Sequence, residues 1–130
     1  RRFFFSVDQA VSLVDQALIL KDKLNGTILS VEMKSAKMID ILRTWIKKVG
    51  GKYKVVNTRK GDRLDEYLIG EDELKYTQEL KIKNKKYYII DFNNLSKKPL
   101  KKIVSSANAK RLSQSEIEKI IKFGLNNNDL

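Results

Sequence analysis

Apolar residues recur at three- and four-residue spacing in three stretches of the chain, and each stretch predicts an amphipathic helix. The first begins at Ser6, which with Gln9 forms the capping-box pattern that marks a helix start. Asn25-Gly26 supplies its stop. We expect its apolar stripe to face a core, and the stripe consists of Val7, Ala10, Val11, Val14, Ala17 and Leu18.

The second stretch runs from Met38 to Val49 and is the cleanest helical stripe of the chain. We expect Ser35 to cap this helix and Gly50-Gly51 to end it. Trp45 lies on the apolar face, where a large ring is typical of core packing.

The third helix is predicted near the C-terminal end of the chain. Ser113-Gln114-Ser115-Glu116 repeats the capping-box pattern, and the apolar face that follows consists of Ile117, Ile120 and Ile121. We expect Gly124 to end this helix ahead of a frayed tail at Asn126-Asn127-Asn128.

Segments rich in β-branched and apolar residues predict strands between these helices. Thr27–Met33 and Tyr53–Asn57 flank the second helix and give a β-α-β order, whose connection is right-handed if the strands are parallel. Leu80–Lys83 and Tyr87–Asp91 lie on either side of Asn84-Lys85-Lys86, which predicts a hairpin. The fold class is therefore α/β, or α+β when isolated, with a small mixed sheet and packed helices.

The length of 130 residues fits a single domain over residues 1–130. Within it, Leu64–Ile69 fits a brief helix. Residues 75–111 form a basic hairpin and an irregular segment around Pro99, and residues 112–130 form the C-terminal helix and tail. The N-terminus has no signal-peptide pattern, and we interpret the chain as a domain of a longer protein.

The composition excludes several kinds of chemistry. The sequence contains no Cys and no His, which removes disulfides, thiolate nucleophiles, imidazole bases and the usual zinc ligands. No apolar run approaches the roughly 20 residues that cross a bilayer, so we expect no membrane span. The absence of cysteine also fits a cytoplasmic protein.

The net charge of +11, from 27 bases and 16 acids, favours a polyanion or a phosphate as partner. The excess is concentrated between Lys75 and Arg111, where eleven bases accompany two acids, Glu79 and Asp91. Lysines on a solvent-facing hairpin are the simpler interpretation of this stretch. A ligand or nucleic-acid surface is the other interpretation.

The segment Thr58–Arg63, which reads Thr-Arg-Lys-Gly-Asp-Arg, places three cationic residues around one glycine. Guanidinium groups bind phosphate bidentately and helix N-terminal amides favour negative charge, so this loop is a candidate phosphate cradle. In the alternative, structural interpretation, Gly61 serves the turn and Asp62 caps a helix.

Three segments resemble, in the right order, motifs of one enzyme family. Arg2–Val11 is similar to Arg-Phe-Phe-Met-Ser-x-Asp-Glu-Ala-Val, Arg59–Leu68 to Arg-x-Gly-Glu-Lys-Leu-x-Glu-x-Leu, and Ser105–Leu112 to Ser-x-Asn-x-x-Arg-Leu. The family is the polysaccharide-biosynthesis branch of the extended short-chain dehydrogenases. Its members are NAD(P)-dependent UDP-N-acetylglucosamine 4,6-dehydratases and 4-epimerases.

The resemblance implies that the chain is the C-terminal, UDP-sugar-binding domain of such an enzyme. Arg2 and Arg59 match arginines that reach the UDP diphosphate. Gly61 would allow close backbone approach, and Asp62 stands where the family has a Glu near the nucleotide. Asn108 and Arg111 match the tail motif, which we take to close over the substrate site or to meet a neighbouring subunit.

The resemblance also implies what lies outside the chain. No Gly-x-x-Gly-x-x-Gly and no Tyr-x-x-x-Lys occurs, so we assign no catalytic residue, cofactor or metal ligand to these residues. NAD(P) is expected in the parent enzyme, bound by a missing N-terminal Rossmann lobe. We expect a homo-oligomer, and without that lobe we expect the stripe of Val11, Val14 and Leu18 to be partly uncovered and to self-associate.

Two other functions stay open. The chain could be a small basic nucleic-acid-binding protein that uses the Lys75–Arg111 surface, with Tyr76, Tyr87 and Tyr88 available for stacking. No helix-turn-helix, zinc or ribonucleoprotein motif accompanies that surface. In the third interpretation the chain mainly makes oligomer contacts for its parent enzyme.

Overall fold

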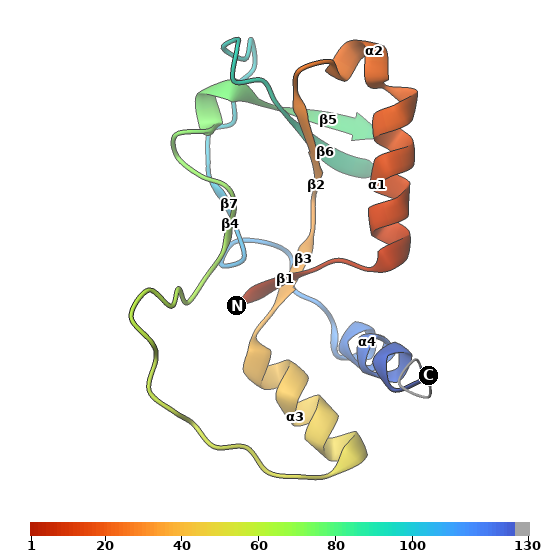
Figure 1. Cartoon of the computed structure of the whole chain (residues 1–130), viewed down its shortest axis with the longest axis vertical. Coiled ribbons are helices and arrows are strands. Elements are labelled where there is room, and N and C mark those ends of the chain that lie inside the picture. Colours follow the sequence, from red (N-terminus) through yellow and green to blue (C-terminus); the bar gives the residue numbers. More distant parts are fainter. Residues whose placement is uncertain (127–130) are drawn as a thin grey trace.

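The computed structural model describes residues 1–126 (Figure 1). Its elements in chain order are β1 (Arg2–Phe4), α1 (Val7–Ile19), α2 (Lys21–Leu24), β2 (Ile28–Val31), β3 (Lys34–Ala36), α3 (Met38–Val49), β4 (Tyr67–Ile69), the 3-10 helix η1 (Leu74–Tyr76), β5 (Thr77–Ile82), β6 (Lys85–Ile90), β7 (Val104–Ser105) and α4 (Gln114–Asn126). They form the expected small α/β domain, built from helices and short sheets.

The strands of the described chain pair into antiparallel sheets. A central sheet has the order β2-β6-β5, and two smaller sheets pair β1 with β3 and β4 with β7. Within residues 1–126 the parallel contacts are limited to an isolated bridge between Ser35 and Arg111. The predicted mixed sheet is therefore wrong in detail, because its second parallel strand does not form.

The hairpin of β5 and β6 confirms the predicted hairpin, with a shifted turn. The turn residues are Lys83 and Asn84, at φ of 45° and 65°. Positive φ at both positions is typical of the two-residue type I′ turn, whose twist matches that of the flanking strands. Lys85 and Lys86, expected in the turn, instead begin β6.

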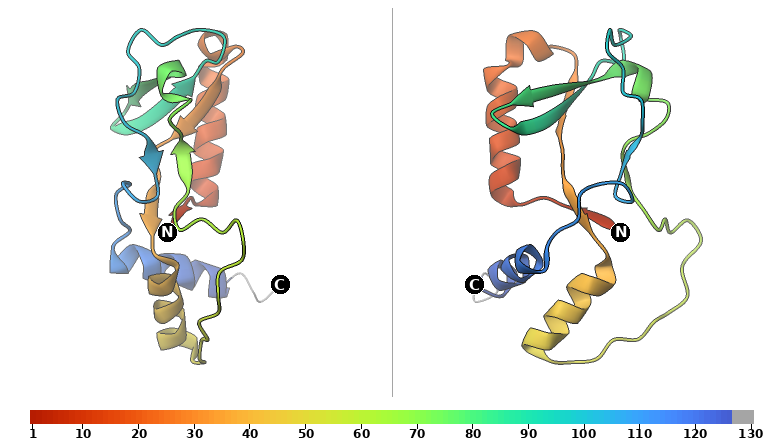
Figure 2. Two further views of the ribbon diagram at one scale, coloured as in Figure 1. Left: turned by 90° about the vertical axis from the view of Figure 1, so that its left-hand side faces the viewer. Right: turned by 180° about the vertical axis from the view of Figure 1, so that it is seen from behind.

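Two apolar clusters hold the fold together. In the half that contains the central sheet, Tyr88 and Ile90 of β6 pack with Ile69 of β4. In the other half, α3 and α4 pack against each other below the β1-β3 sheet, as Figures 1 and 2 show. The cluster there contains Ala36, Ile117 and Ile121, with Trp45 packed on it as predicted.

The local helix signals are largely confirmed. Ser6 Oγ accepts the Gln9 backbone N–H and Gln9 Oε1 accepts the Ser6 N–H, so the first capping box is complete. Glu116 and Ser113 make the same exchange before α4. The predicted end of that helix is wrong, because α4 passes through Gly124 and continues to Asn126. Residues 127–130, most of the predicted frayed tail, lie outside the described residues.

The prediction that Ser35 caps α3 is wrong, because Ser35 belongs to β3. It is fully buried, its N–H donates to the Lys110 carbonyl, and its carbonyl accepts the Leu112 N–H. Its other edge pairs with β1. The backbone at Ser35 is thus extended by partners on both sides, and α3 begins after Lys37 without a side-chain cap.

Two further predicted elements are wrong. Residues 53–57 form no strand, and Val55 and Val56 are 82% and 73% exposed in a long loop. The β-α-β unit therefore does not form, and β2 pairs with β6 instead. Leu64–Ile69 is not a helix, because Tyr67 pairs with Ser105 and makes the backbone extended as β4 begins.

The outer stripe of α1 is exposed rather than buried. Val7, Val11, Val14 and Leu18 are between 54% and 67% exposed, which contradicts the expectation that this stripe faces a core of the chain itself. It agrees with the expectation that Val11, Val14 and Leu18 are uncovered. Among the described residues, no helix combines the length and apolarity needed to cross a bilayer.

Candidate functional site

The three motif segments found in the sequence meet at one place in the fold. There a group of polar residues, which we call the polar hub, joins the start of the chain, β3, the entry to β4 and the segment after β7. Its members are Arg1, Ser35, Asp65, Ser106 and Arg111. The hub lies near the N-terminal label in Figure 1, where β1 and β3 cross below β4 and β7.

Ser106 is the centre of the hub and is fully buried. Its N–H donates to the Glu66 carbonyl at 2.8 Å, and its Oγ accepts the Glu66 N–H at 2.9 Å. The same Oγ lies 3.2 Å from both the Asp65 carboxylate and the Arg1 carbonyl, either of which can accept its proton. One hydroxyl therefore fixes the backbone that leads into β4.

Asp65 is held by Arg1 within the hub. The Arg1 guanidinium donates to both carboxylate oxygens of Asp65 at 3.1 Å. Burial would raise the pKa of Asp65, but the hydrogen bond and charge of Arg1 and the Ser106 hydroxyl together lower it. Asp65 is thus ionised at neutral pH and serves as an acceptor.

Arg111 and Asn108, two predicted site residues, brace the same region. The Arg111 guanidinium donates to Ser35 Oγ, to the Ser106 carbonyl at 2.6 Å and to the Ala107 carbonyl at 2.7 Å. Asn108 Oδ1 accepts the N–H of Ser105 at 2.9 Å, and its Nδ2 donates to the Ile103 carbonyl at 2.8 Å. The structure gives both side chains bonds to the protein's own backbone.

Arg2 extends the hub toward the predicted phosphate loop. Its guanidinium donates to the carbonyls of Arg1 at 2.7 Å and Arg63 at 3.2 Å, and its Nε lies 3.3 Å from the Glu66 carboxylate. The other Glu66 oxygen accepts the Phe3 N–H at 3.0 Å. Arg2 therefore fixes the base of the loop from the end of the β1-β3 sheet.

Residues 58–63, which we call the cationic loop, turn sharply at Arg59–Asp62. Asp62 donates its N–H to the Arg59 carbonyl at 3.1 Å, and its carboxylate accepts the Arg59 N–H at 2.8 Å. Gly61 has a φ of 91°, a conformation that favours glycine at the third position of a type II turn. Asp62 thus closes the turn from within, and it caps no helix.

The cationic loop presents its charge to solvent. Arg59, Lys60 and Arg63 are exposed, and within residues 1–126 their side chains form no hydrogen bond or ion pair. Arg59 and Arg63 are four positions apart, so at most about 14 Å of extended chain joins their Cα atoms. The structure therefore brings Arg2 to the end of the loop that contains Arg59, Gly61 and Asp62, while Arg111 belongs to the hub and Asn108 bonds to the backbone on either side of β7.

Several residues of the hub, and Glu66 beside it, were missed as functional candidates. Asp65, Glu66 and Ser106 stand inside the motifs that carry the family resemblance, so their positions were visible in the sequence. Ser35 gave no such signal. The described residues hold no cluster of His, Cys, Asp and Glu suited to a metal ion.

The basic surface between Lys75 and Arg111 does not present the three tyrosine rings that the nucleic-acid interpretation needs for base stacking. Tyr87 and Tyr88 are only 4% and 3% exposed, so two of the three rings are too deeply buried to stack on a base. Tyr76 packs against Phe92, with a ring-centroid distance of 5.6 Å, and Lys75 lies over its face. Lys86 is paired with Glu79 at 3.3 Å and with Glu32 at 3.6 Å.

Comparisons with known proteins give the family. The fold is similar to that of a solved structure of Pen from Bacillus thuringiensis, with a TM-score of 0.70, 20% identity and 95% of this chain covered. A Methanocaldococcus jannaschii protein described as an uncharacterized membrane protein is 33% identical over 93% of this chain. The chain spans 38% of the length of each. Residues 1–91 match the family described as polysaccharide biosynthesis protein, and the chain belongs to that family.

Proposed function

We propose that this chain is the substrate-binding part of a nucleotide-sugar enzyme of polysaccharide biosynthesis, of the UDP-N-acetylglucosamine 4,6-dehydratase or 4-epimerase type. In this proposal the cationic loop binds the UDP diphosphate. The observation that carries it is the loop itself, whose three cationic side chains are exposed while its one acid is engaged in the turn. The family match supports the setting in polysaccharide biosynthesis.

The chemistry of the loop suits a diphosphate. A guanidinium group such as that of Arg59 offers paired N–H donors that match two phosphate oxygens, and Lys60 adds a mobile positive charge. Gly61 presents backbone without a side chain, and no atom of the protein lies within 4 Å of the position that a Cβ would take there. A phosphate can therefore approach the backbone of the turn closely.

The hub gives the loop a fixed base. Arg2 contacts the Arg63 carbonyl, and Ser106 holds Glu66, so the chain leaving the loop is anchored on two sides. A binding group on an anchored loop loses less conformational entropy on binding than one on a free segment. We infer that Arg2 acts first as a positioning residue for the loop and, as the resemblance implies, also reaches the diphosphate.

The remainder of the enzyme is part of the proposal. A dinucleotide-binding lobe would bring NAD(P) and the proton-transfer groups, while this chain supplies binding energy and orientation. The share of 38% that the chain covers in its relatives leaves ample length for such a lobe. The exposed stripe of α1 and the exposed Val55 and Val56 are surfaces that it could cover, within a homo-oligomer.

Calorimetric titration of the natural full-length protein with UDP-N-acetylglucosamine tests the proposal. We expect Arg59→Ala to weaken binding by about tenfold to a hundredfold, the loss of one or two charge-assisted hydrogen bonds. Arg43→Ala is the matched control, because Arg43 is an exposed arginine of α3. Equal affinities of the wild-type protein and Arg59→Ala would contradict the proposal, as would salt-sensitive binding of an oligonucleotide without binding of the UDP-sugar.

A further inference from the structure

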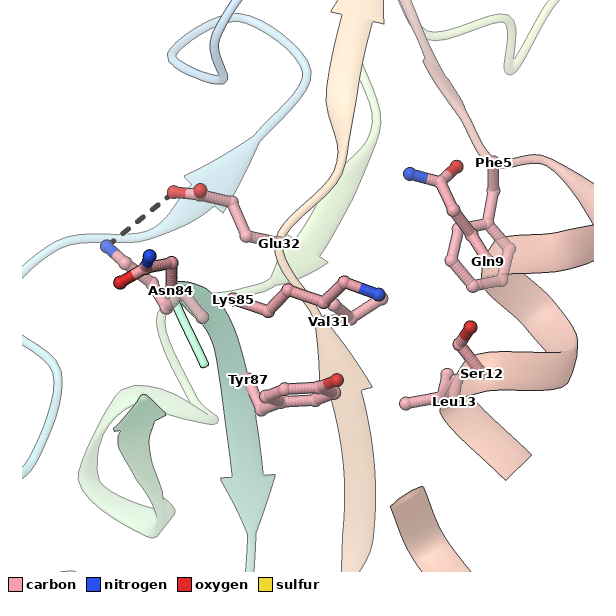
Figure 3. A pocket seen from close by; sticks show the side chains of 10 residues that line it. Phe5, Gln9, Ser12, Leu13, Val31, Glu32, Asn84, Lys85 and Tyr87 are labelled. Atoms are coloured by element: carbon pink, nitrogen blue, oxygen red, sulfur yellow. Dashed lines mark ion pairs between the residues drawn. The ribbon is translucent and has the colours of Figure 1, made fainter. Parts of the chain in front are cut away.

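A pocket that is separate from the cationic loop lies between α1 and the first residues of β6. Its volume is about 160 Å³. Figure 3 shows Lys85 and Tyr87 reaching from β6 toward α1, and Gln9 and Ser12 facing them from the helix. The Phe5 ring forms part of the wall. No part of the proposed diphosphate site contributes to it.

Tyr87 gives the pocket a hydroxyl group that has no hydrogen-bond partner among the described residues. The residue is only 4% exposed, and its hydroxyl end is directed into the space in front of α1 (Figure 3). Within residues 1–126 this hydroxyl has no hydrogen-bond partner, and its oxygen is not among the fully buried unpaired atoms, so it is open to the pocket. Its strand neighbours Val31 and Leu80 are apolar and offer none. The Tyr87 ring is therefore held in place by burial, while its hydroxyl faces the pocket and is available to a ligand.

The other polar groups of the pocket can also donate. Gln9 Oε1 already accepts the Ser6 N–H at 2.8 Å, which leaves the amide nitrogen for a ligand. Ser12 and Lys85 form no side-chain hydrogen bond or ion pair with the described residues. Together with Tyr87 they supply an amide, two hydroxyls and an ammonium group, all able to donate hydrogen bonds.

The charges of the pocket favour an anion. Glu32 belongs to its lining, but in Figure 3 its carboxylate turns to the other side of β2, where it meets Lys86 at 3.6 Å. A second contact, with Lys110 at 3.4 Å, holds it there. The side of the pocket that faces α1 thus carries the ammonium group of Lys85 without an opposing carboxylate from the residues drawn.

We propose that this pocket is a binding site for a small oxyanion, a carboxylate or a phosphate. The Lys85 ammonium group supplies the charge, and the Tyr87 and Ser12 hydroxyls and the Gln9 amide donate hydrogen bonds to the oxygens. A volume of about 160 Å³ holds about five waters, the scale of a small anion rather than of a whole nucleotide sugar. This inference does not depend on the proposal that the cationic loop binds a diphosphate.

Titration of the full chain at constant ionic strength, followed by the amide signals of Ser12, Lys85 and Tyr87 in NMR spectra, tests the site. The probes are inorganic phosphate and acetate, in separate experiments. We expect saturable shifts with at least one anion, and the anion that binds more tightly identifies the phosphate or the carboxylate as the natural group. Absence of saturable shifts with both anions would overturn the proposal.

Two variants separate this pocket from general charge attraction. Tyr87→Phe removes only the hydroxyl, and Lys85→Met removes the cation; we expect each to weaken anion binding about tenfold. Lys81→Met is the control, because Lys81 is an exposed lysine on the neighbouring strand of the hairpin and lies outside the pocket. An equal loss in Lys81→Met, or undiminished binding in Tyr87→Phe, would overturn the site.

Discussion

A single side chain of the hub can satisfy the backbone groups of a distant segment. Ser106 and Ser105 are neighbours in sequence and both are buried, yet only the Ser106 hydroxyl bonds to the backbone of another segment among the described residues. Removing that oxygen leaves the Glu66 N–H without its acceptor inside the protein. A buried donor that loses its partner is destabilising by more than the ordinary net value of a hydrogen bond.

We therefore expect Ser106→Ala to lower the free energy of unfolding by about 1–3 kcal/mol. Urea denaturation followed by the fluorescence of Trp45 measures it. Ser105→Ala is the matched control, because it also shortens a buried serine, and we expect less than half the effect. Equal losses in the two variants would mean that packing, not the hydroxyl bonds, accounts for the hub.

At the scale of elements, α4 depends on one glutamate at its start. Glu116 accepts the Ser113 N–H at 2.9 Å and pairs with Lys34 of β3 at 2.6 Å. The Lys34 hydrogen bond and the bonds from Ser113 lower the pKa of Glu116 to about 2. The same carboxylate thus caps the helix and joins it to the β1-β3 sheet.

The sign of the pH dependence follows from that lowered pKa. In the unfolded chain Glu116 has its ordinary pKa of 4.5, so its contribution to stability is complete above that pH and is lost as the pH falls toward about 2. We expect Glu116→Gln to lower the melting temperature at pH 7 and to match the wild-type protein near pH 2. Thermal denaturation across this range measures the difference. Glu118→Gln, on the same helix, is the control and should change the melting temperature at pH 7 less, because the Glu118 carboxylate pairs with no cation among the described residues.

The elements that could be predicted are those whose signals are local. The helix at Met38–Val49 and both capping boxes depend on residues three or four positions apart, and Asn84 marks the hairpin turn. The pairing of Arg2 with Ala36 depends on residues that meet only in the folded chain. Strands of three residues are too short to show a recognisable alternation of apolar and polar positions, which is why β1, β3 and β4 were missed.

The candidate site divides in the same way. The cationic loop could be predicted because Arg59, Gly61 and Asp62 are contiguous in the motif. The bonds of Arg111 to Ser35 and of Ser106 to Asp65 could not, because each joins segments that are far apart in the sequence. The same limit explains α1: a periodic stripe shows that a face is apolar, but not which surface covers it.

At the scale of the whole molecule, the outer stripe of α1 is an apolar surface that the described residues leave uncovered. Leu18 is 64% exposed, and beside the helix lies an apolar groove of about 490 Å³ lined by Leu13, Ala17 and Leu29. Burial of apolar surface stabilises association by roughly 25 cal/mol per Å². When no other surface covers the stripe, the same stripe of a second copy of the chain can pack against it.

We therefore expect the 130-residue chain to self-associate as its concentration rises, and Leu18→Glu to shift it toward the monomer. Sedimentation velocity over a concentration series measures the distribution. Leu95→Glu is the control, because Leu95 is 69% exposed in a different part of the molecule. A strictly monomeric wild-type chain at every concentration would contradict the expectation.

The polar hub also has a consequence for the order of folding. Its hydroxyl contacts join residues 41 and 105 positions apart, whereas the hairpin of β5 and β6 closes over two residues. Closing long loops costs more chain entropy than closing short ones, so local elements form first. We therefore expect the hub to form late in folding, so that weakening it speeds unfolding more than it slows folding. The hub would then act mainly on the rate of unfolding, which stopped-flow unfolding of Ser106→Ala in urea measures.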